Sequence, residues 1–146
     1  MSVKRILEAK KIKLISCRPR DTIETVAEIL TVNKIGALPV RDGEGKLIGI
    51  ISERDIVRGF AEKGRAIGDS RVENLMTRDV AVCRPTDTLK TVMATMSRRH
   101  IRHLPVVENG ALIGIISQRD VMAVRLEEAE LETNVLRDRV LTQARS

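Results

Sequence analysis

Aromatic residues are almost absent from this chain of 146 residues: Phe60 is the only phenylalanine, and there is no tyrosine or tryptophan. Stacking platforms for single-stranded nucleic acid are built from aromatic side chains, so that mode of recognition is excluded. Hydrophobic residues make up 42% of the chain and must form a core from Ile, Val, Leu, Ala and Met. This length fits one compact domain or two very small ones.

Cysteine is also scarce, with Cys17 and Cys83 only, and neither a CxxC spacing nor a zinc-finger arrangement occurs. Buried small hydrophobes at strand positions are the favoured interpretation, and a single disulfide is the alternative. No apolar run approaches the roughly 20 residues that span a bilayer, and the N-terminal segment lacks a signal-peptide core. The sequence therefore predicts a soluble, cytoplasmic protein without a membrane partner.

The chain contains an internal repeat. Residues 17–57 align with residues 83–122, half of the aligned positions are identical, and the first copy has one extra residue. A period of roughly 65 residues is longer than the about 20–50 residues of solenoid repeats. We therefore expect two halves of one domain, related by an approximate two-fold axis, with sites at their seam occurring in pairs.

Each copy follows the order β-α-β-β-α, which predicts an α/β (α+β) fold with helices packed against small sheets. An extended segment precedes a proline, and an amphipathic helix follows, for which Asp21 and Asp87 are the expected N-caps. Two strands joined by a glycine-containing turn come next. The expected ranges are 13–18 and 79–84 for the extended segments, and 37–41 with 47–52 and 103–107 with 112–117 for the hairpins.

The Gly-Ile-Ile run in each hairpin shows no polar alternation, so we expect both faces of that strand to be covered. Residues 62–71 should form a surface connection, and residues 72–76 should repeat a short helical turn at 3–7. A final helix from about 120 to 144 is either a partner-binding helix or a solvated extension. The expected boundaries are 1–66 for the first repeat, 67–122 for the second and 123–146 for the C-terminal helix.

The strongest match between the copies is Gly-Ile-Ile-Ser-x-Arg-Asp, at residues 49–55 and 114–120. Ser-x-x-Asp before a helix is, first of all, a capping box. The same geometry presents free N–H groups to an anion, the arginine adds a charge, and the carboxylate can accept from two vicinal ribose hydroxyls. The candidate phosphate and ribose ligands are therefore Ser52, Arg54, Asp55, Ser117, Arg119 and Asp120.

Positive charge is concentrated at residues 98–103 within a chain of net charge +6, which favours an anionic partner. Arg98 and Arg99 suit the C-terminal end of a helix. Arg102 and His103 enter a strand beside the expected cleft and are additional phosphate candidates. An imidazole such as that of His103 can titrate near neutral pH.

Taken together, Pro-x-Asp-Thr, Leu-Pro-Val and Gly-Ile-Ile-Ser-x-Arg-Asp resemble the CBS domain, named after cystathionine β-synthase. Two copies resemble a tandem CBS pair, or Bateman module, over about residues 3–122. The resemblance implies a non-catalytic, energy-sensing regulatory module that binds AMP, ADP, ATP, NAD(H) or S-adenosylmethionine and requires no metal. It also implies a homodimer through the CBS helices and an effector protein that is regulated in trans.

The resemblance further implies that the serines face phosphate, that the aspartates face ribose, and that the other repeat supplies most of each adenine slot. The slot for the second motif is expected at Lys13, Ile15, Ile35 and Gly36. The slot for the first motif is expected at Thr77, Asp79, Ala81, Ile101 and Arg102. The motif isoleucines Ile50 and Ile115 belong to these slots. Because the slots differ, we expect unequal occupancy or two different ligands.

Two other functions compete with this interpretation. The positive charge suits a nucleic-acid-binding module, but aromatic residues and known RNA- or DNA-binding signatures are missing. A purely structural dimerisation module would use both Ser-x-x-Asp motifs only as helix caps. Catalysis is not expected, because the sequence shows neither a general-base motif nor a metal-ligand cluster beside the motifs.

Overall fold

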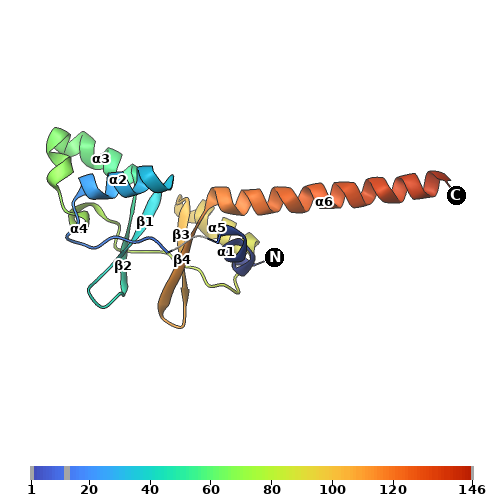
Figure 1. Ribbon diagram of the computed structural model, residues 1–146, viewed down its shortest axis with the longest axis horizontal. Helices are drawn as coiled ribbons and strands as arrows, with labels where there is room; N and C mark the ends of the chain where they lie inside the picture. The colour runs from blue at the N-terminus through green and yellow to red at the C-terminus, as the bar shows by residue number, and fades with distance from the viewer. Residues whose placement is uncertain (1, 12–13, 146) are drawn as a thin grey trace.

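The protein consists of two similar halves and a long projecting helix, as seen in a computed structural model that describes residues 2–11 and 14–145 (Figure 1). In chain order the elements are α1 (Val3–Lys10), α2 (Ile23–Asn33), β1 (Ala37–Arg41), β2 (Leu47–Ser52), α3 (Glu53–Lys63), the 3-10 helix η1 (Gly64–Asp69), α4 (Val72–Leu75), α5 (Leu89–Arg99), β3 (His103–Glu108), β4 (Ala111–Ser117) and α6 (Gln118–Arg145).

Each half is built on one antiparallel hairpin, β1–β2 or β3–β4. The expected α+β arrangement of two hairpins and packed helices is thus confirmed, with β1 and β2 at the expected bounds. The two extended segments contribute only single bridges, from Cys17 to Val40 and from Cys83 to Val106, so they are not full strands. Lys13, at the start of the first segment, lies outside the described residues.

The helix caps differ from the expectation by one residue. Thr22 and Thr88 are the N-caps of α2 and α5, and each hydroxyl accepts a hydrogen bond from the backbone N–H three residues on, at 3.2 and 3.1 Å. The carboxylates of Asp21 and Asp87 instead accept from the backbone N–H three residues earlier, at 2.9 Å in both halves. These aspartates therefore close the turn after each proline.

The expectation that β2 and β4 are covered on both faces is wrong. Ile51 and Ile116 are fully buried, whereas Ile50 is only partly buried and Ile113 is 39% exposed. A two-stranded sheet packed by helices on one side leaves its other face open to a cleft or to solvent. The consecutive isoleucines therefore differ in environment: Ile51 and Ile116 face a hydrophobic core, and Ile50 lies on the more open face of its strand.

The halves exchange their leading helices. Val3 and Ile6 of α1 belong to the hydrophobic core of the second half, around Ile116, while Val72 of α4 belongs to the core of the first half, around Ile51. The backbone follows the same exchange, because the N–H of Val3 donates to the carbonyl of Asp87 at 3.0 Å and the N–H of Val72 to that of Asp21 at 2.9 Å. Each leading helix therefore packs on the core of the other half, and these two contacts hold the halves together.

The connection between the repeats is more than a surface loop. It forms η1, and Ile67 is buried in the first core, which corrects the expectation for residues 62–71.

The two thiols are free and buried, as expected for small hydrophobes at these positions. Burial, with a smaller contribution from Asp21 or Asp87, raises the pKa of Cys17 and Cys83 to about 12, so neither thiol is ionised at neutral pH.

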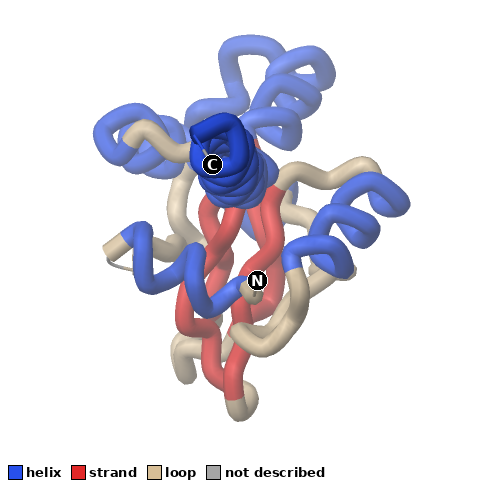
Figure 2. The backbone as a smooth tube through the Cα atoms, turned by 90° about the vertical axis from the view of Figure 1, so that its right-hand side faces the viewer, coloured by secondary structure: helices blue, strands red, loops and turns tan. Residues whose placement is uncertain are grey.

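Helix α6 begins directly after Ser117 and ends at Arg145, close to the expected range. Val121 and Val124 pack into the second core, and the remaining turns project away from both halves (Figure 1). Viewed from the side of the C-terminus, α6 lies almost end-on in front of the strands (Figure 2). Leu126 and Leu131 on the projecting part are about 60% exposed. Among the described residues, no helix is both long and apolar enough to span a membrane.

Candidate ligand-binding site

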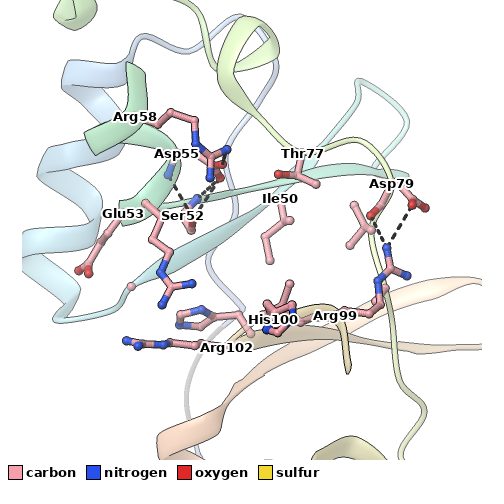
Figure 3. A pocket seen from close by; sticks show the side chains of 16 residues that line it. Ile50, Ser52, Glu53, Asp55, Arg58, Thr77, Asp79, Arg99, His100 and Arg102 are labelled. Atoms are coloured by element: carbon pink, nitrogen blue, oxygen red, sulfur yellow. Dashed lines mark hydrogen bonds and ion pairs between the residues drawn. The ribbon is translucent and has the colours of Figure 1, made fainter. Parts of the chain in front are cut away.

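A cavity of about 400 Å³ lies at the N-terminal end of α3, between the first half and the segments 77–81 and 99–103 (Figure 3). Its volume falls in the range of about 300–1,000 Å³ that is usual for small-molecule sites. Eleven of the sequence-predicted site residues line this one cavity: Gly36, Ile50, Ser52, Arg54, Asp55, Thr77, Asp79, Ala81, Ile101, Arg102 and His103.

The first Ser-x-x-Asp motif is a complete capping box. The Asp55 carboxylate accepts hydrogen bonds from the backbone N–H of Ser52 at 2.8 Å and from its hydroxyl at 3.1 Å, and the N–H of Asp55 faces the Ser52 hydroxyl at 3.4 Å. Asp55 is only 9% exposed, so the box fixes its carboxylate at the edge of the cavity. Capping and ligand binding are compatible here, because the serine hydroxyl and the helix N-terminus both border the cavity.

Charge around the cavity is mixed rather than simply positive. Four arginines and three carboxylates line it, together with two histidines. Arg99 is paired with Asp79 at 3.1 Å, and Arg58 lies 3.9 Å from Asp55. Arg102 lies across the cavity from the Ser52 end (Figure 3). Together with the N–H groups at the start of α3, the arginines provide positive potential for an anionic group.

Part of the cavity lining is apolar, and we call it the apolar wall. It consists of Ile50, Val80, Ala81 and Ile101. Ile50 and Thr77 exchange two backbone hydrogen bonds, of 3.0 and 2.9 Å, and this pairing holds the segment after α4 against β2. The wall therefore has a fixed position relative to the motif.

His103 lies where the two halves meet. A Cβ atom on Gly36 would be 3.2 Å from two atoms of the His103 ring, so glycine leaves room for the imidazole. Burial lowers the pKa of His103; Lys10 and Arg102 also lower it, and the carboxylates of Asp120 and Glu53 oppose the shift. His103 is therefore mostly neutral at neutral pH in the absence of a bound anion, which makes it a hydrogen-bonding group more than a cation.

Five lining residues are not among the candidates predicted from the sequence: Glu53, Arg58, Val80, Arg99 and His100. Two of them belong to the basic run, where the sequence accounts for Arg99 only as a helix end. Arg58 follows Arg54 by four residues on α3, so one helical turn places both near the same opening. Helix periodicity is the signal that could have identified Arg58.

The second Ser-x-x-Asp motif has the same local geometry but different neighbours. The N–H of Ser117 donates to Asp120 at 2.8 Å, and the N–H of Asp120 donates to the Ser117 hydroxyl at 3.1 Å. The Lys10 ammonium lies 2.7 Å from the same carboxylate. Of the other residues expected at this site, Arg119 is exposed, Ile15 and Ile35 pack against the first core, and Gly36 lines the first cavity.

Among residues 2–11 and 14–145, no set of three or more His, Cys, Asp or Glu side chains is arranged to hold an ion.

The repeat, the exchanged helices and the paired motifs correspond to a known family. The family model of the CBS domain matches residues 3–62 and 72–127. The chain therefore belongs to the CBS-domain family, as a tandem pair.

Sequence relatives include MJ1225 of Methanocaldococcus jannaschii, which is 36% identical over 119 residues, covering 81% of this chain and 40% of that protein. The mitochondrial CBS domain-containing protein CBSX3 of Arabidopsis thaliana is 33% identical over 116 residues, covering 77% of this chain and 56% of the relative. The chain thus spans only about half the length of these relatives, or less.

Solved structures of other CBS proteins have the same fold. The CBS-domain protein ATU1752 from Agrobacterium tumefaciens has a TM-score of 0.82 and 38% identity, with 85% of this chain and 92% of that chain covered. The CBS domain pair of MJ0100, solved in complex with 5-methylthioadenosine and S-adenosyl-L-methionine, has a TM-score of 0.78 and 29% identity, with coverage of 88% and 98%.

Proposed function

We propose that this CBS pair is a non-catalytic, cytoplasmic regulatory module that binds an adenosine nucleotide in the cavity beside Ser52 and Asp55. The observation that carries the proposal is the combination, in one cavity, of a helix N-terminus with a capping box and of the apolar wall. A ligand with an anionic group, a diol and a flat aromatic ring matches this combination of environments. Adenosine ligands are found with the MJ0100 pair.

Each part of the nucleotide has a proposed position. The phosphate lies at the start of α3, near the Ser52 hydroxyl and Arg54, with Arg102 as a further partner. The ribose hydroxyls donate to Asp55, and the adenine lies against Ile50 and the apolar wall. AMP, ADP, ATP and NAD(H) share these groups, while S-adenosylmethionine lacks the phosphate.

Regulation follows from the location of the cavity between segments of both repeats. A ligand that contacts both sides favours one relative arrangement of the halves, and an effector protein that binds one arrangement better responds to the ligand. We propose that such an effector acts in trans and senses cellular energy through the nucleotide.

The first test compares nucleotide binding by the wild type with binding by Asp55→Asn. The panel comprises AMP, ADP, ATP, NAD(H) and S-adenosylmethionine, measured by isothermal titration calorimetry. Hydrogen bonds to a charged group contribute about 1.5–3 kcal/mol, so we expect Asp55→Asn to weaken the best ligand at least about tenfold. Asp87→Asn is the matched control, because Asp87 accepts a similar backbone hydrogen bond outside the cavity and should leave affinity unchanged.

Equal affinity in the wild type and Asp55→Asn would contradict the ribose position. If no adenosine ligand binds, the two Ser-x-x-Asp motifs act only as helix caps, and the structural dimerisation module is favoured. Tight binding of RNA or DNA that falls steeply with salt would favour the nucleic-acid alternative, since each phosphate contact adds to the salt dependence.

We also propose a homodimer formed through the helices. Val32 on α2, Val57 and Phe60 on α3, and Met122 on α6 are large apolar residues that are 56–78% exposed. Val57 and Met122 occupy the same position in the two copies of the motif. An exposed apolar position that occurs in both repeats, with further apolar residues on α2 and α3, suits a contact with a second copy.

Charge on this surface is expected to separate the dimer. We expect Val57→Glu combined with Phe60→Glu to shift the sedimentation coefficient to that of a monomer, because two carboxylates would be buried without partners. Val82→Glu, at another exposed apolar residue that lies outside the helices, is the control and should remain dimeric. A wild-type chain that sediments as a monomer at high concentration would contradict the proposal.

A further inference from the structure

The two Ser-x-x-Asp motifs differ in what their carboxylates contact. In the first half the Asp55 carboxylate is bonded by its own capping box, and the one cation near it among the described residues is the exposed Arg58 guanidinium at 3.9 Å. In the second half the ammonium of Lys10 lies 2.7 Å from Oδ2 of Asp120, the oxygen that also accepts from the N–H of Ser117. Asp120 is thus engaged by a cation from the chain itself.

The difference arises from the length of the leading helices. Helices α1 and α4 start alike, with Val3 and Val72 fully buried, but α1 has eight residues and α4 has four. Glu8, Ala9 and Lys10 are strong helix formers and continue α1 for one more turn. In α4 the chain leaves the helix at Met76 and continues in an extended conformation.

The extra turn replaces a backbone contact by a side-chain contact. After α4, Thr77 pairs with Ile50 of β2, and the carbonyl of Ile50 accepts from the N–H of Thr77 at 2.9 Å. The corresponding carbonyl in β4, that of Ile115, instead accepts from the ammonium of Lys10 at 3.2 Å. The Lys10 ammonium therefore contacts both the carbonyl of Ile115 in β4 and the carboxylate of Asp120 in the second motif.

The ion pair between Lys10 and Asp120 is also partly buried. The Lys10 side chain is 24% exposed and that of Asp120 is 19% exposed, so the pair is partly shielded from water. A hydrogen-bonded ion pair in such a place is stronger than one on an open surface. The glycine before the motif isoleucines does not distinguish the two halves, because a Cβ would lie 2.9 Å from Leu7 at Gly114 and 2.6 Å from Met76 at Gly49.

We propose that Lys10 is an internal occupant of the second motif, which keeps nucleotide out of that site and makes the first cavity the high-affinity site of the chain. This inference rests on the proposed function, since it assumes that the first cavity binds a nucleotide. A ligand enters the second motif only after the terminal turn of α1 withdraws Lys10 from Asp120.

Calorimetry with the nucleotide that binds the wild type best tests the proposal. We expect one nucleotide per wild-type chain and two per Lys10→Met chain, with the additional site lost again in the double variant Lys10→Met, Asp120→Asn. Lys4→Met is the matched control, because Lys4 is an exposed lysine on the same helix, and it should bind one nucleotide. A Lys10→Met chain that still binds one nucleotide overturns the proposal and leaves the proposed function intact.

Amine acetylation followed by mass spectrometry tests the ion pair without any ligand. We expect Lys10 to react several-fold more slowly than Lys4 in the wild type, and equally fast in Asp120→Asn. Equal rates in the wild type would overturn the inferred contact. If no nucleotide binds either form, the proposed function fails, and the exclusion role of Lys10 fails with it even where the labelling shows the pair.

Discussion

Replacing Ile116 by alanine is expected to remove about 2–5 kcal/mol from the free energy of unfolding. Ile116 is fully buried in the second core, where it contacts the helices that enclose β4. Truncation leaves a cavity that the packed neighbours fill only in part. The loss is measured by urea denaturation followed by circular dichroism, with the midpoint shifted and the slope unchanged.

Ile113 provides the matched control for this measurement. It is the same residue type on the same strand, but it is 39% exposed. Ile113→Ala is expected to cost about 1 kcal/mol, less than Ile116→Ala, because more than a third of the side chain is already exposed to water. Equal losses for Ile113→Ala and Ile116→Ala would contradict the one-sided burial of β4 described above.

A leucine side chain at Gly36 is expected to fill part of the cavity and to weaken nucleotide binding at the first site strongly. Gly36 lines the cavity, and a Cβ there would already lie 3.2 Å from the His103 ring and 3.7 Å from the Glu53 carboxyl carbon. The larger side chain of Gly36→Leu must displace His103 and occupy the space proposed for the ligand. We expect at least a 30-fold loss of affinity, about 2 kcal/mol, in calorimetry with AMP.

Gly43→Leu separates this effect from a general intolerance of leucine. Gly43 lies in the turn between β1 and β2, where a Cβ would have only its chain neighbours within 4 Å, and neither glycine has a left-handed φ. We expect Gly43→Leu to bind AMP like the wild type. Unchanged affinity in Gly36→Leu, with the fold preserved, would place the ligand elsewhere.

Much of the fold could be predicted because the repeat presents each local signal twice. Glycine-containing turns and apolar strands locate the hairpins to within a residue or so, and β1 and β2 have the expected bounds. The predicted N-caps are misplaced by one residue, since aspartate and threonine both cap helices well and only the turn after each proline decides between them. Local chemistry alone does not resolve that competition.

The cavity could be predicted in composition but not in its full arrangement. Residues on the motif and in the slot of the other repeat do meet, as shown by Asp55 and Ala81. Gly36 is expected beside the second motif but lines the first cavity, and nothing in the sequence pattern points to Lys10. The position of Lys10 depends on how far α1 extends and where it packs, which is a tertiary property that no spacing within one repeat reveals.

The exchange of α1 and α4 has a consequence for assembly. A single repeat of this kind could not complete itself, because its leading helix finds its place only on another repeat. Separate repeats would have to associate by diffusion. When two repeats are joined in one chain, their association becomes intramolecular and takes place at a high effective concentration. The segment between the repeats therefore acts as a tether. Each leading helix stays packed on the other repeat of its own chain, however dilute the protein becomes.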